Sequence, residues 1–387
     1  MLIPTERHRR FGTTDLPVPA GSYAPGVTPQ GLPRIIAAAS RFPERYERQA
    51  DLARWYQRVS GGGGEAPPEC IERFFARTGV EGRHLVLPRE AYASLGGFGE
   101  RSALWLEHGL ALGHAAVTGA LARAQLDASE VSLFVSSSVT GIAAPSIEAR
   151  IMAARGDFAP GCRRLPLFGL GCVAGAAGVA RVSEYLRANP THAALLLCVE
   201  LCSLTFQLSD ASIANVIGSA LFGDGAACVV MVGADHRLAQ SARGMAVVDT
   251  RSRFFAGTER TMGWDIVDNG FRIILSGSVP ELARGAFSVE AREFLADHDL
   301  APADLTHWFG HPGGPAVINA IEDGLDLSRG TLDASRRTLA RVGNLSSVSV
   351  LLLLEEALQS EPQPGTGEGL LYAMGPGFCA ELVLLRW

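Results

Sequence analysis

The chain has 387 residues, a formal net charge of −6 and 34 basic side chains that are all arginine, because lysine is absent. Without lysine there is no Schiff base for pyridoxal phosphate or aldolase chemistry. The lysines that bind phosphate in P-loop nucleotidases and protein kinases are excluded for the same reason. The acidic balance argues against a nucleic-acid partner. Any phosphate that the protein binds must contact arginine, backbone N–H groups or a helix N-terminus.

The composition indicates a large buried core in a reducing compartment. Hydrophobic residues make up 47% of the chain and charged residues 19%, which favours a globular enzyme over a disordered protein. The seven cysteines are odd in number and do not cluster, so free thiols are expected. The first ten residues lack an apolar stretch, and the strongly apolar run at 348–354 is too short to cross a bilayer. We therefore expect a cytoplasmic protein without a membrane span.

Strands and helices alternate along most of the chain. Residues 1–31 carry five prolines and predict an irregular N-terminal arm. Beyond this arm, short apolar runs alternate with segments of helical period. The predicted strands are 33–40, 131–138, 164–171, 193–201, 226–233, 307–311, 369–377 and 378–387. The predicted helices are 44–59, 103–125, 172–188, a segment after residue 314, and 344–358.

This alternation predicts an α/β protein whose parallel strands are covered by helices on both faces. The same logic of strand, junction and helix recurs in the second part of the chain. We therefore expect two halves, 32–242 and 243–387, which could be a duplicated unit.

Cys172 is the first candidate for chemistry. It follows a buried strand and a Gly-Leu-Gly turn, and it precedes a helix of small residues. A cysteine at a helix N-terminus is favoured as a thiolate, because the backbone dipole lowers its pKa. The alternative is a small buried apolar residue, which most cysteines are.

His311 and Asn344 occupy similar junctions. His311 ends a strand and precedes Pro-Gly-Gly-Pro and a helix, so it is held rigidly enough to be a general base or a thiolate partner. A structural histidine in a turn is the alternative. Asn344 stands at the head of an apolar helix, where it is either an N-cap or an amide donor to an oxyanion. Such junctions gather at the carboxyl ends of strands, so the three residues predict one site.

Five segments in the right order resemble the chalcone synthase family, the type III polyketide synthases. They are GCVAGAAGVAR around Cys172, SALFGDGAACVV at 219–230, GHPGGPAVI around His311, GNLSSVSVL around Asn344, and AMGPGFCAEL at 373–382. The resemblance covers residues 32–387. It implies a thiolase fold, five αβαβα layers built from two related halves, and a homodimer. Papain-type proteases also use Cys, His and Asn, but their sequence context around the cysteine is absent here.

The resemblance also implies a reaction. An acyl-CoA starter would load on Cys172, which His311 would keep as a thiolate through an ion pair. His311 and Asn344 would then stabilise the enolate formed when malonyl-CoA loses carbon dioxide, and the enolate would attack the thioester in repeated cycles before cyclisation. No metal or redox cofactor is implied. Gly375, Pro376 and Gly377 match the family's loop near the cyclisation site, with Ala373 and Met374 departing from its pattern.

Other positions bear on the substrate. Phe222 matches one gatekeeper phenylalanine of the family, whereas Ile273 replaces the other. Ala144 replaces a methionine of the loop that crosses the dimer, and Thr205 and Ser346 fall on positions that line the pocket. The loss of an aromatic ring and a methionine suggests a roomier cavity, similar to that of bacterial members that convert medium- or long-chain fatty acyl-CoA starters into alkylpyrones or alkylresorcinols.

The CoA phosphates need cationic partners, and Arg77 and Arg83 match the segment that the family uses at its tunnel mouth. A solvated helix face is the alternative for these arginines. Glu200 stands between Cys198 and Cys202 and is interpreted as a structural, paired charge, and Cys202 could line a cavity. Two other hypotheses stay open: a ketoacyl-ACP synthase of the third class, which condenses once, and a silent partner protein with this fold.

Overall fold

The computed structural model describes residues 31–60, 68–240, 244–360 and 367–387. In this part of the chain, nine strands form one mixed sheet whose two halves meet through a short pairing of β1 with β8. In spatial order, the first half consists of β1 (Arg34–Arg41), β7 (Asp224–Val232), β6 (Ala193–Leu201), β4 (Val131–Ser137) and β5 (Arg163–Leu167). The second half consists of β8 (Met245–Phe254), β13 (Cys379–Arg386), β12 (Glu368–Gly375) and β11 (His307–Gly310).

The two halves of the sheet repeat one pattern of strand directions. In the first half, β4 is parallel to β6, and β6–β7 and β7–β1 are antiparallel. In the second half, β11 is parallel to β12, and β12–β13 and β13–β8 are antiparallel. The expectation of parallel strands therefore holds for β4–β5, β4–β6 and β11–β12 and was wrong for the antiparallel pairs. Between β12 and β13 only residues 376–378 intervene, and so short a connection can join only antiparallel neighbours.

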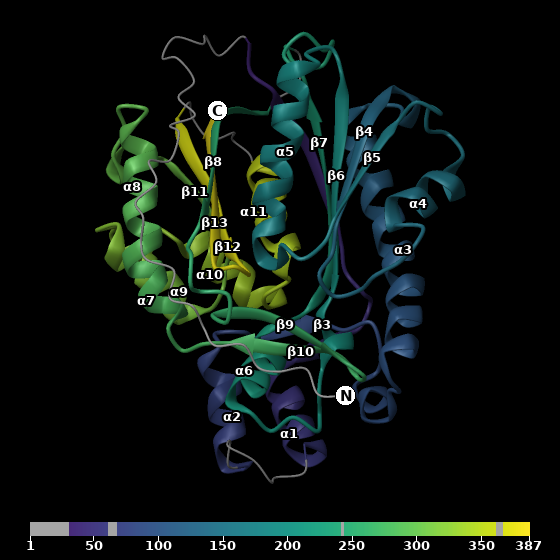
Figure 1. Cartoon of the computed structure of the whole chain (residues 1–387), viewed down its shortest axis with the longest axis vertical. Coiled ribbons are helices and arrows are strands. Elements are labelled where there is room, and N and C mark those ends of the chain that lie inside the picture. Colours follow the sequence, from purple (N-terminus) through teal and green to yellow (C-terminus); the bar gives the residue numbers. More distant parts are fainter. Residues whose placement is uncertain (1–30, 61–67, 241–243, 361–366) are drawn as a thin grey trace, which may run out of the picture.

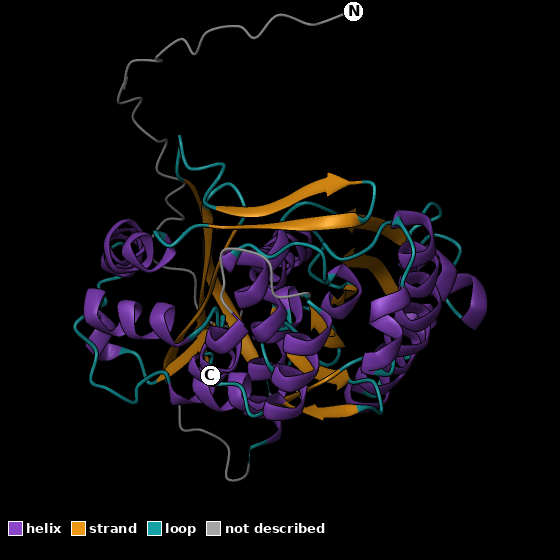
Figure 2. Ribbon diagram, turned by 90° about the horizontal axis from the view of Figure 1, so that it is seen from below, coloured by secondary structure: helices purple, strands orange, loops and turns teal. Residues whose placement is uncertain are grey.

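Helices and sheet halves form five layers (Figure 1). Helices α5 (Ala174–Ala188) and α11 (Ser349–Gln359) lie between the two halves of the sheet. The outer side of the first half is covered by α3 (Phe98–Ala124) and α4 (Ile147–Arg155). The outer side of the second half is covered by α7 (Val279–Leu282), α8 (Ser288–Ala296) and α9 (Pro315–Gly324), and α10 (Asp333–Val342) packs beside α9 and α11. This is the layering of the thiolase fold. Figure 2 shows from below that helices flank the strands on both sides.

The sequence of the central elements explains this layering. All nine residues of β6 are buried, because the strand has helices on both faces. Its alternate side chains enter two separate cores: Leu195 and Leu197 face the outer helices, whereas Leu196 and Cys198 face the inner ones. Helix α5 carries many Ala and Gly residues, which let it fit closely between the two halves of the sheet.

The remaining elements form the lower end of the molecule in Figure 1. They are α1 (Gln49–Val59), α2 (Pro68–Arg77), α6 (Ile213–Leu221), the short pair β2 (Tyr46–Arg48) and β3 (Gly82–His84), and the hairpin β9 (Met262–Val267) and β10 (Gly270–Leu275). No helix in the described ranges is long and apolar enough to cross a membrane. The predicted arm at 1–31, apart from Gly31, and the predicted boundary between residues 242 and 243 lie outside the described residues.

Candidate active site

A cavity of about 630 Å³ lies among α2, α6, the β9–β10 hairpin and the junctions of the central layers. Its walls are mainly apolar. The apolar lining residues include Phe74, Val139, Ile213, Ile217, Leu221, Phe222, Met262, Trp264, Ile273, Ile274, Leu275, Val279, Val317 and Met374. The polar side chains on its surface include Arg77, Thr78, Cys172, Cys202, Ser212, Ser276, His311, Asn344 and Ser346. Cys172, His311 and Asn344 thus border one space, as the three junction motifs predicted.

Cys172 lies in a tight 3₁₀ turn, Gly171–Val173, just before α5. Two glycines make this turn possible, because Gly169 and Gly171 have φ angles of +87° and +54°. A side chain at residue 171 would also meet Pro376 at 2.8 Å. The Cys172 side chain is half-buried and faces the cavity.

Burial controls the charge of Cys172. It raises the pKa of the thiol to about 12; the Ser346 hydroxyl acts against this rise, and the charge of Glu200 adds to it. The lowering expected from the helix N-terminus is therefore outweighed by desolvation, which favours the thiol form of the side chain. Activation of Cys172 needs a group that removes the proton during the reaction.

His311 is fixed by its backbone at the end of β11. Its N–H donates to the carbonyl of Tyr372 at 3.0 Å, and Ser335 donates to the carbonyl of the preceding Gly310 at 2.7 Å. Gly314, at a φ of +139°, then turns the chain into α9, which begins at Pro315. Burial lowers the pKa of His311 to about 4, so the ring is neutral near pH 7. Its Nδ1 atom is buried and has no hydrogen-bond partner among the described residues.

The amide of Asn344 is oriented by a neighbouring backbone group. Its Oδ1 atom accepts the N–H of Ser346 at 2.8 Å, as in a capped turn. This bond assigns oxygen and nitrogen, and the amide nitrogen is left without a hydrogen bond to any described residue while the residue borders the cavity. The two alternatives for Asn344 are therefore compatible, since the oxygen caps the turn and the nitrogen is free to donate.

Together the three residues offer a thiol, a neutral imidazole and an amide donor in a space with mainly apolar walls. Hydrogen-bond donors fixed in such a space stabilise an oxyanion strongly, because they need no reorganisation. The burial of Cys172 and His311 favours the neutral form of each, so the thiolate–imidazolium pair stays a prediction.

The predicted gatekeepers lie on two different elements. Phe222 follows α6 and contacts Trp264, with ring centroids 6.3 Å apart. Ile273 is the register partner of Trp264 on the β9–β10 hairpin, and all three border the cavity. Trp264 and the hairpin were missed from the sequence. The sequence did carry a signal for this hairpin. Asp268-Asn269-Gly270, a common hairpin turn, interrupts the stretch that forms β9 and β10.

The other predicted pocket residues are spread more widely. Ser346 borders the cavity with its hydroxyl buried, and its φ is +49°. Thr205 lines instead a separate space of about 10 Å³ behind Phe222 and Ile273. Ala144 is exposed on the loop before α4 and does not border the cavity in the described chain.

The two predicted CoA-binding arginines differ in position. Arg77 ends α2, is exposed, borders the cavity and has no hydrogen bond or ion pair to any described residue. It is therefore well placed to meet a phosphate. Arg83 is 1% exposed and donates to the carbonyl of Phe222 at 2.8 Å. This burial is at odds with a contact between Arg83 and CoA. The spacing of the arginines in the sequence could not reveal that Arg83 is buried.

The predicted loop Gly375-Pro376-Gly377 lies directly against the Cys172 turn. A side chain at residue 375 would come within 2.6 Å of the carbonyl of Leu170, so only glycine permits this approach. Pro376 borders the cavity itself. The loop therefore forms part of the wall beside the nucleophile.

Glu200 lies beneath the site and has hydrogen-bond donors but no cationic partner in the described part of the chain. It accepts hydrogen bonds from Val139 N–H at 3.1 Å, Thr140 Oγ1 at 2.9 Å and Ser347 Oγ at 2.5 Å. Burial raises its pKa to about 7, although these donors oppose the rise. Cys202 borders the cavity, as the sequence analysis considered for this cysteine. Within the described ranges, no three His, Cys, Asp or Glu side chains gather as a metal site would need.

Two models of one protein family match the two parts of this chain. Residues 24–236 match the model for the N-terminal domain of chalcone and stilbene synthases, and residues 246–387 match the model for the C-terminal domain. A 1,3,6,8-tetrahydroxynaphthalene synthase of Streptomyces peucetius subsp. caesius is 48% identical over 91% of this chain and 93% of its own length. The α-pyrone synthesis polyketide synthase-like Pks18 of Mycobacterium tuberculosis is 29% identical over 93% of this chain and 92% of its own.

The crystal structure of the tetrahydroxynaphthalene synthase of Streptomyces coelicolor, a bacterial type III polyketide synthase, superposes with a TM-score of 0.86 at 27% identity, over 92% of this chain and 99% of that one. The chain therefore belongs to the chalcone and stilbene synthase family. It is an acyltransferase of the type III polyketide synthase class, whose substrates are acyl-CoA and malonyl-CoA. This membership favours repeated condensation over the two other hypotheses, a ketoacyl-ACP synthase and a silent partner.

Proposed function

We propose that the enzyme loads a medium- or long-chain fatty acyl group on Cys172, extends it with malonyl-CoA and releases an alkylpyrone or a resorcinol-type product. The observation that carries this proposal is the cavity of about 630 Å³ with predominantly apolar walls that reaches Cys172. Apolar walls stabilise an alkyl chain by removing it from water. With Ile273 in place of an aromatic ring, the wall beside Trp264 also leaves more room for a chain.

In the loading step, the Cys172 sulfur attacks the thioester carbonyl of the acyl-CoA. His311 accepts the thiol proton and then returns it to the departing CoA sulfur, so that a new thioester and free CoA result. A neutral His311 fits this role, because a general base must begin unprotonated. Arg77 at the cavity would hold the CoA phosphates.

In the extension step, malonyl-CoA loses carbon dioxide. The electron pair of the broken C–C bond stays on the remaining acetyl-CoA unit, which is thereby an enolate. The Asn344 amide and a His311 N–H would donate hydrogen bonds to the enolate oxygen. These two donors would stabilise the negative charge that develops there. The enolate carbon attacks the thioester carbonyl, a C–C bond forms, and the C–S bond to Cys172 breaks. The lengthened chain returns to Cys172 for the next cycle, and Gly375, Pro376 and Gly377 would shape the final ring closure.

A second candidate rests on sequence identity. The relative that is 48% identical is named for tetrahydroxynaphthalene, a product without an alkyl tail. If this enzyme made the same product, malonyl-CoA would supply the starter unit as well as the extension units. The relative named for α-pyrone synthesis supports the first candidate at lower identity.

Mass spectrometry of products distinguishes the two candidates. The enzyme is incubated with malonyl-CoA alone and with malonyl-CoA plus a series of acyl-CoA starters, including an aromatic one. We expect products that retain a fatty chain and higher kcat/KM for fatty than for aromatic starters. Tetrahydroxynaphthalene from malonyl-CoA alone, unchanged by added fatty acyl-CoA, contradicts the fatty-starter proposal.

We also propose a homodimer. The edge strand β5 pairs only with β4 among the described strands, and most of its residues are exposed. Exposed strand edges with apolar neighbours are surfaces that natural proteins cover. Leu165 on β5 and Phe168 just after it are 39% and 50% exposed, and Ile142, on the loop that also carries Ala144, is 45% exposed. Sedimentation equilibrium should give twice the 40.9 kDa chain mass, whereas a monomer at micromolar concentration contradicts the dimer.

A further inference from the structure

Arg83 is a buried cation that the proposed reaction does not use. It is only 1% exposed, and its guanidinium carbon lies 5.7 Å from the ring centre of Phe75 and 6.0 Å from that of Phe206. Its one side-chain hydrogen bond is from Nη1 to the carbonyl of Phe222 at 2.8 Å, and its Nε is buried without a partner among the described residues. Burying a cation with so few partners costs free energy, so this position needs an explanation.

The charge of Arg83 is balanced at a distance by Asp224. The Asp224 carboxylate is itself held by Val86 N–H at 2.8 Å and by the N–H and hydroxyl of Ser203 at 2.8 and 2.5 Å. Burial lowers the pKa of Arg83 to about 10, although Asp224 opposes the shift. The guanidinium therefore keeps its proton at neutral pH, and its donor stays directed at Phe222.

The carbonyl that Arg83 holds belongs to a bridge between the two halves of the site. The N–H of Asn344 donates to Leu221 at 2.8 Å, and the N–H of Gly223 donates to the carbonyl of Asn344 at 3.0 Å. This parallel bridge pairs Phe222 with Asn344. The carbonyl of Phe222 takes no part in these two bonds and is satisfied by Arg83.

Two glycines close the bridge over the Arg83 side chain. A methyl group at residue 223 would lie 2.6 Å from the carbonyl of Val342 and 3.2 Å from Cβ of Arg83. A methyl group at residue 343, where φ is +77°, would lie 2.7 Å from the carbonyl of Leu221. The packing is therefore built closely around the buried arginine.

We propose that Arg83 is a positioning residue that fixes Phe222 and Asn344 relative to each other, and so sets both the extension step and the choice of starter. The proposal rests on the proposed roles of Phe222 and Asn344. Arg83 makes no hydrogen bond to the turn that carries Cys172. Loss of Arg83 should therefore disturb malonyl-CoA decarboxylation and starter selection while sparing acyl transfer to Cys172.

The test separates these partial reactions in the purified full chain. Acyl transfer to Cys172 is followed by intact mass, and decarboxylation by the acetyl-CoA formed from malonyl-CoA alone. In Arg83→Met we expect decarboxylation to fall by about tenfold to a hundredfold, since a displacement near 1 Å has such effects. Loading should stay within about threefold, and the order of preferred starter lengths should change. Unchanged decarboxylation and starter preference overturn the proposal, as does an equal fall of loading and decarboxylation.

Two further variants keep the test decisive. If Arg83→Met does not fold, Arg83→Lys keeps the charge but loses the planar group between the two rings. We then expect the ratio of decarboxylation to loading to fall at least about threefold, and a wild-type ratio overturns the proposal. Arg187→Met is the matched control, because Arg187 donates to the carbonyls of Val247 and Val248 away from the cavity and should change stability without changing this ratio.

The proposed functions of the partners are tested separately by Asn344→Ala. If that variant decarboxylates malonyl-CoA at the wild-type rate, the proposed role of Asn344 fails whatever the Arg83 variants show. If Asn344→Ala loses decarboxylation and Arg83→Met keeps it, the role of Asn344 stands and the role of Arg83 fails.

Discussion

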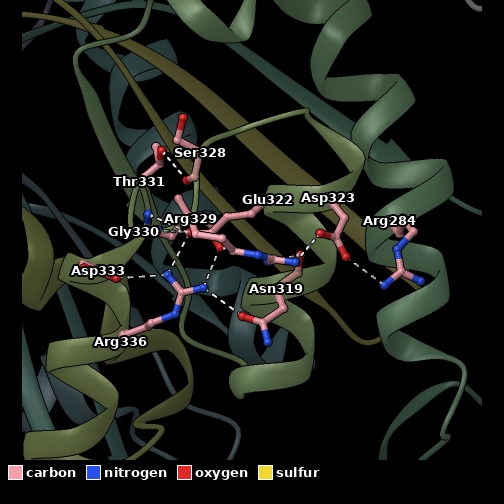
Figure 3. Close-up of polar contacts among 11 residues, drawn as sticks. Arg284, Asn319, Glu322, Asp323, Ser328, Arg329, Gly330, Thr331, Asp333 and Arg336 are labelled. Atoms are coloured by element: carbon pink, nitrogen blue, oxygen red, sulfur yellow. Dashed lines mark hydrogen bonds and ion pairs between the residues drawn. The ribbon is translucent and has the colours of Figure 1, made fainter.

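Replacing Glu322 by glutamine should destabilise the second half of the molecule. Glu322 on α9 is fully buried and accepts hydrogen bonds from Arg336 at 2.6 and 2.7 Å and from Arg329 at 3.1 Å (Figure 3). The N–H groups of Gly330 and Leu332 also donate to it, each at 3.2 Å. The carboxylate therefore ties α9, the following loop and α10 together.

The size of the effect follows from the pKa of Glu322. Burial alone would raise this pKa, but Arg336, the N–H of Leu332 and Arg329 together lower it from 4.5 to about 2. A difference of about 2.5 pKa units corresponds to about 3 kcal/mol of folding free energy near pH 7. Because the folded pKa is depressed, this contribution is complete above pH 4.5 and is lost as the pH falls through 2. At pH 3 about 1 kcal/mol should remain.

Urea unfolding of the wild-type protein and of Glu322→Gln at pH 7 and pH 3 measures both numbers. Asp323→Asn is the control, because Asp323 is 38% exposed and pairs with Arg284 and Arg329 at the rim of the same cluster. The control should lose less than about 1 kcal/mol, as exposed ion pairs do. A loss below about 1 kcal/mol for Glu322→Gln at pH 7, or an equal loss at both pH values, refutes this reasoning.

Three further predictions concern catalysis. Asn344→Ala should lower malonyl-CoA decarboxylation about a hundredfold to a thousandfold, the usual cost of one oxyanion donor; a loss below about fivefold in acetyl-CoA formation contradicts the role. Ile273→Phe should lower kcat/KM for long acyl chains more than for short ones in a chain-length series, because a ring at this wall fills the cavity; a uniform change speaks against it. Arg77→Ala should raise the KM for both CoA substrates about tenfold with little change in kcat, whereas Arg54→Ala on the exposed face of α1 should leave KM unchanged.

The sequence predicted the three central residues because each stands at a junction with its own local signature. Glycines before Cys172, the Pro-Gly-Gly-Pro turn after His311 and the apolar helix after Asn344 each define a strand-to-helix or loop-to-helix transition. Such local patterns survive folding, since they are set by backbone conformation at a few residues. The shared cavity of the three residues follows from the arrangement of the strands.

Properties that depend on long-range packing could not be predicted in the same way. Arg83 has an ordinary polar context in the sequence, and only the closing of α2 and the Phe222 segment over it makes it a core residue. The sign of the Cys172 pKa shift also depends on burial by distant elements, which outweighs the local helix dipole. The antiparallel strand pairs were missed because periodicity reports burial of a strand but not its direction.

The domain boundary near residue 242, the homodimer, the cytoplasmic location and the roles of the individual site residues stay predictions. Among them, the role of Cys172 is the one on which the proposed reaction depends most. Each later step needs a chain held as a thioester beside His311 and Asn344.

The most direct test is intact-protein mass spectrometry after incubation with a fatty acyl-CoA, followed by peptide mapping. The wild-type protein should gain the mass of one acyl group on the peptide that contains Cys172, and hydroxylamine should remove it. Cys172→Ala should gain no mass and make no polyketide, while Cys198→Ala, buried on β6 away from the cavity, should still be acylated. Acylation of Cys172→Ala to the wild-type level, or product formation by that variant, contradicts the proposed mechanism.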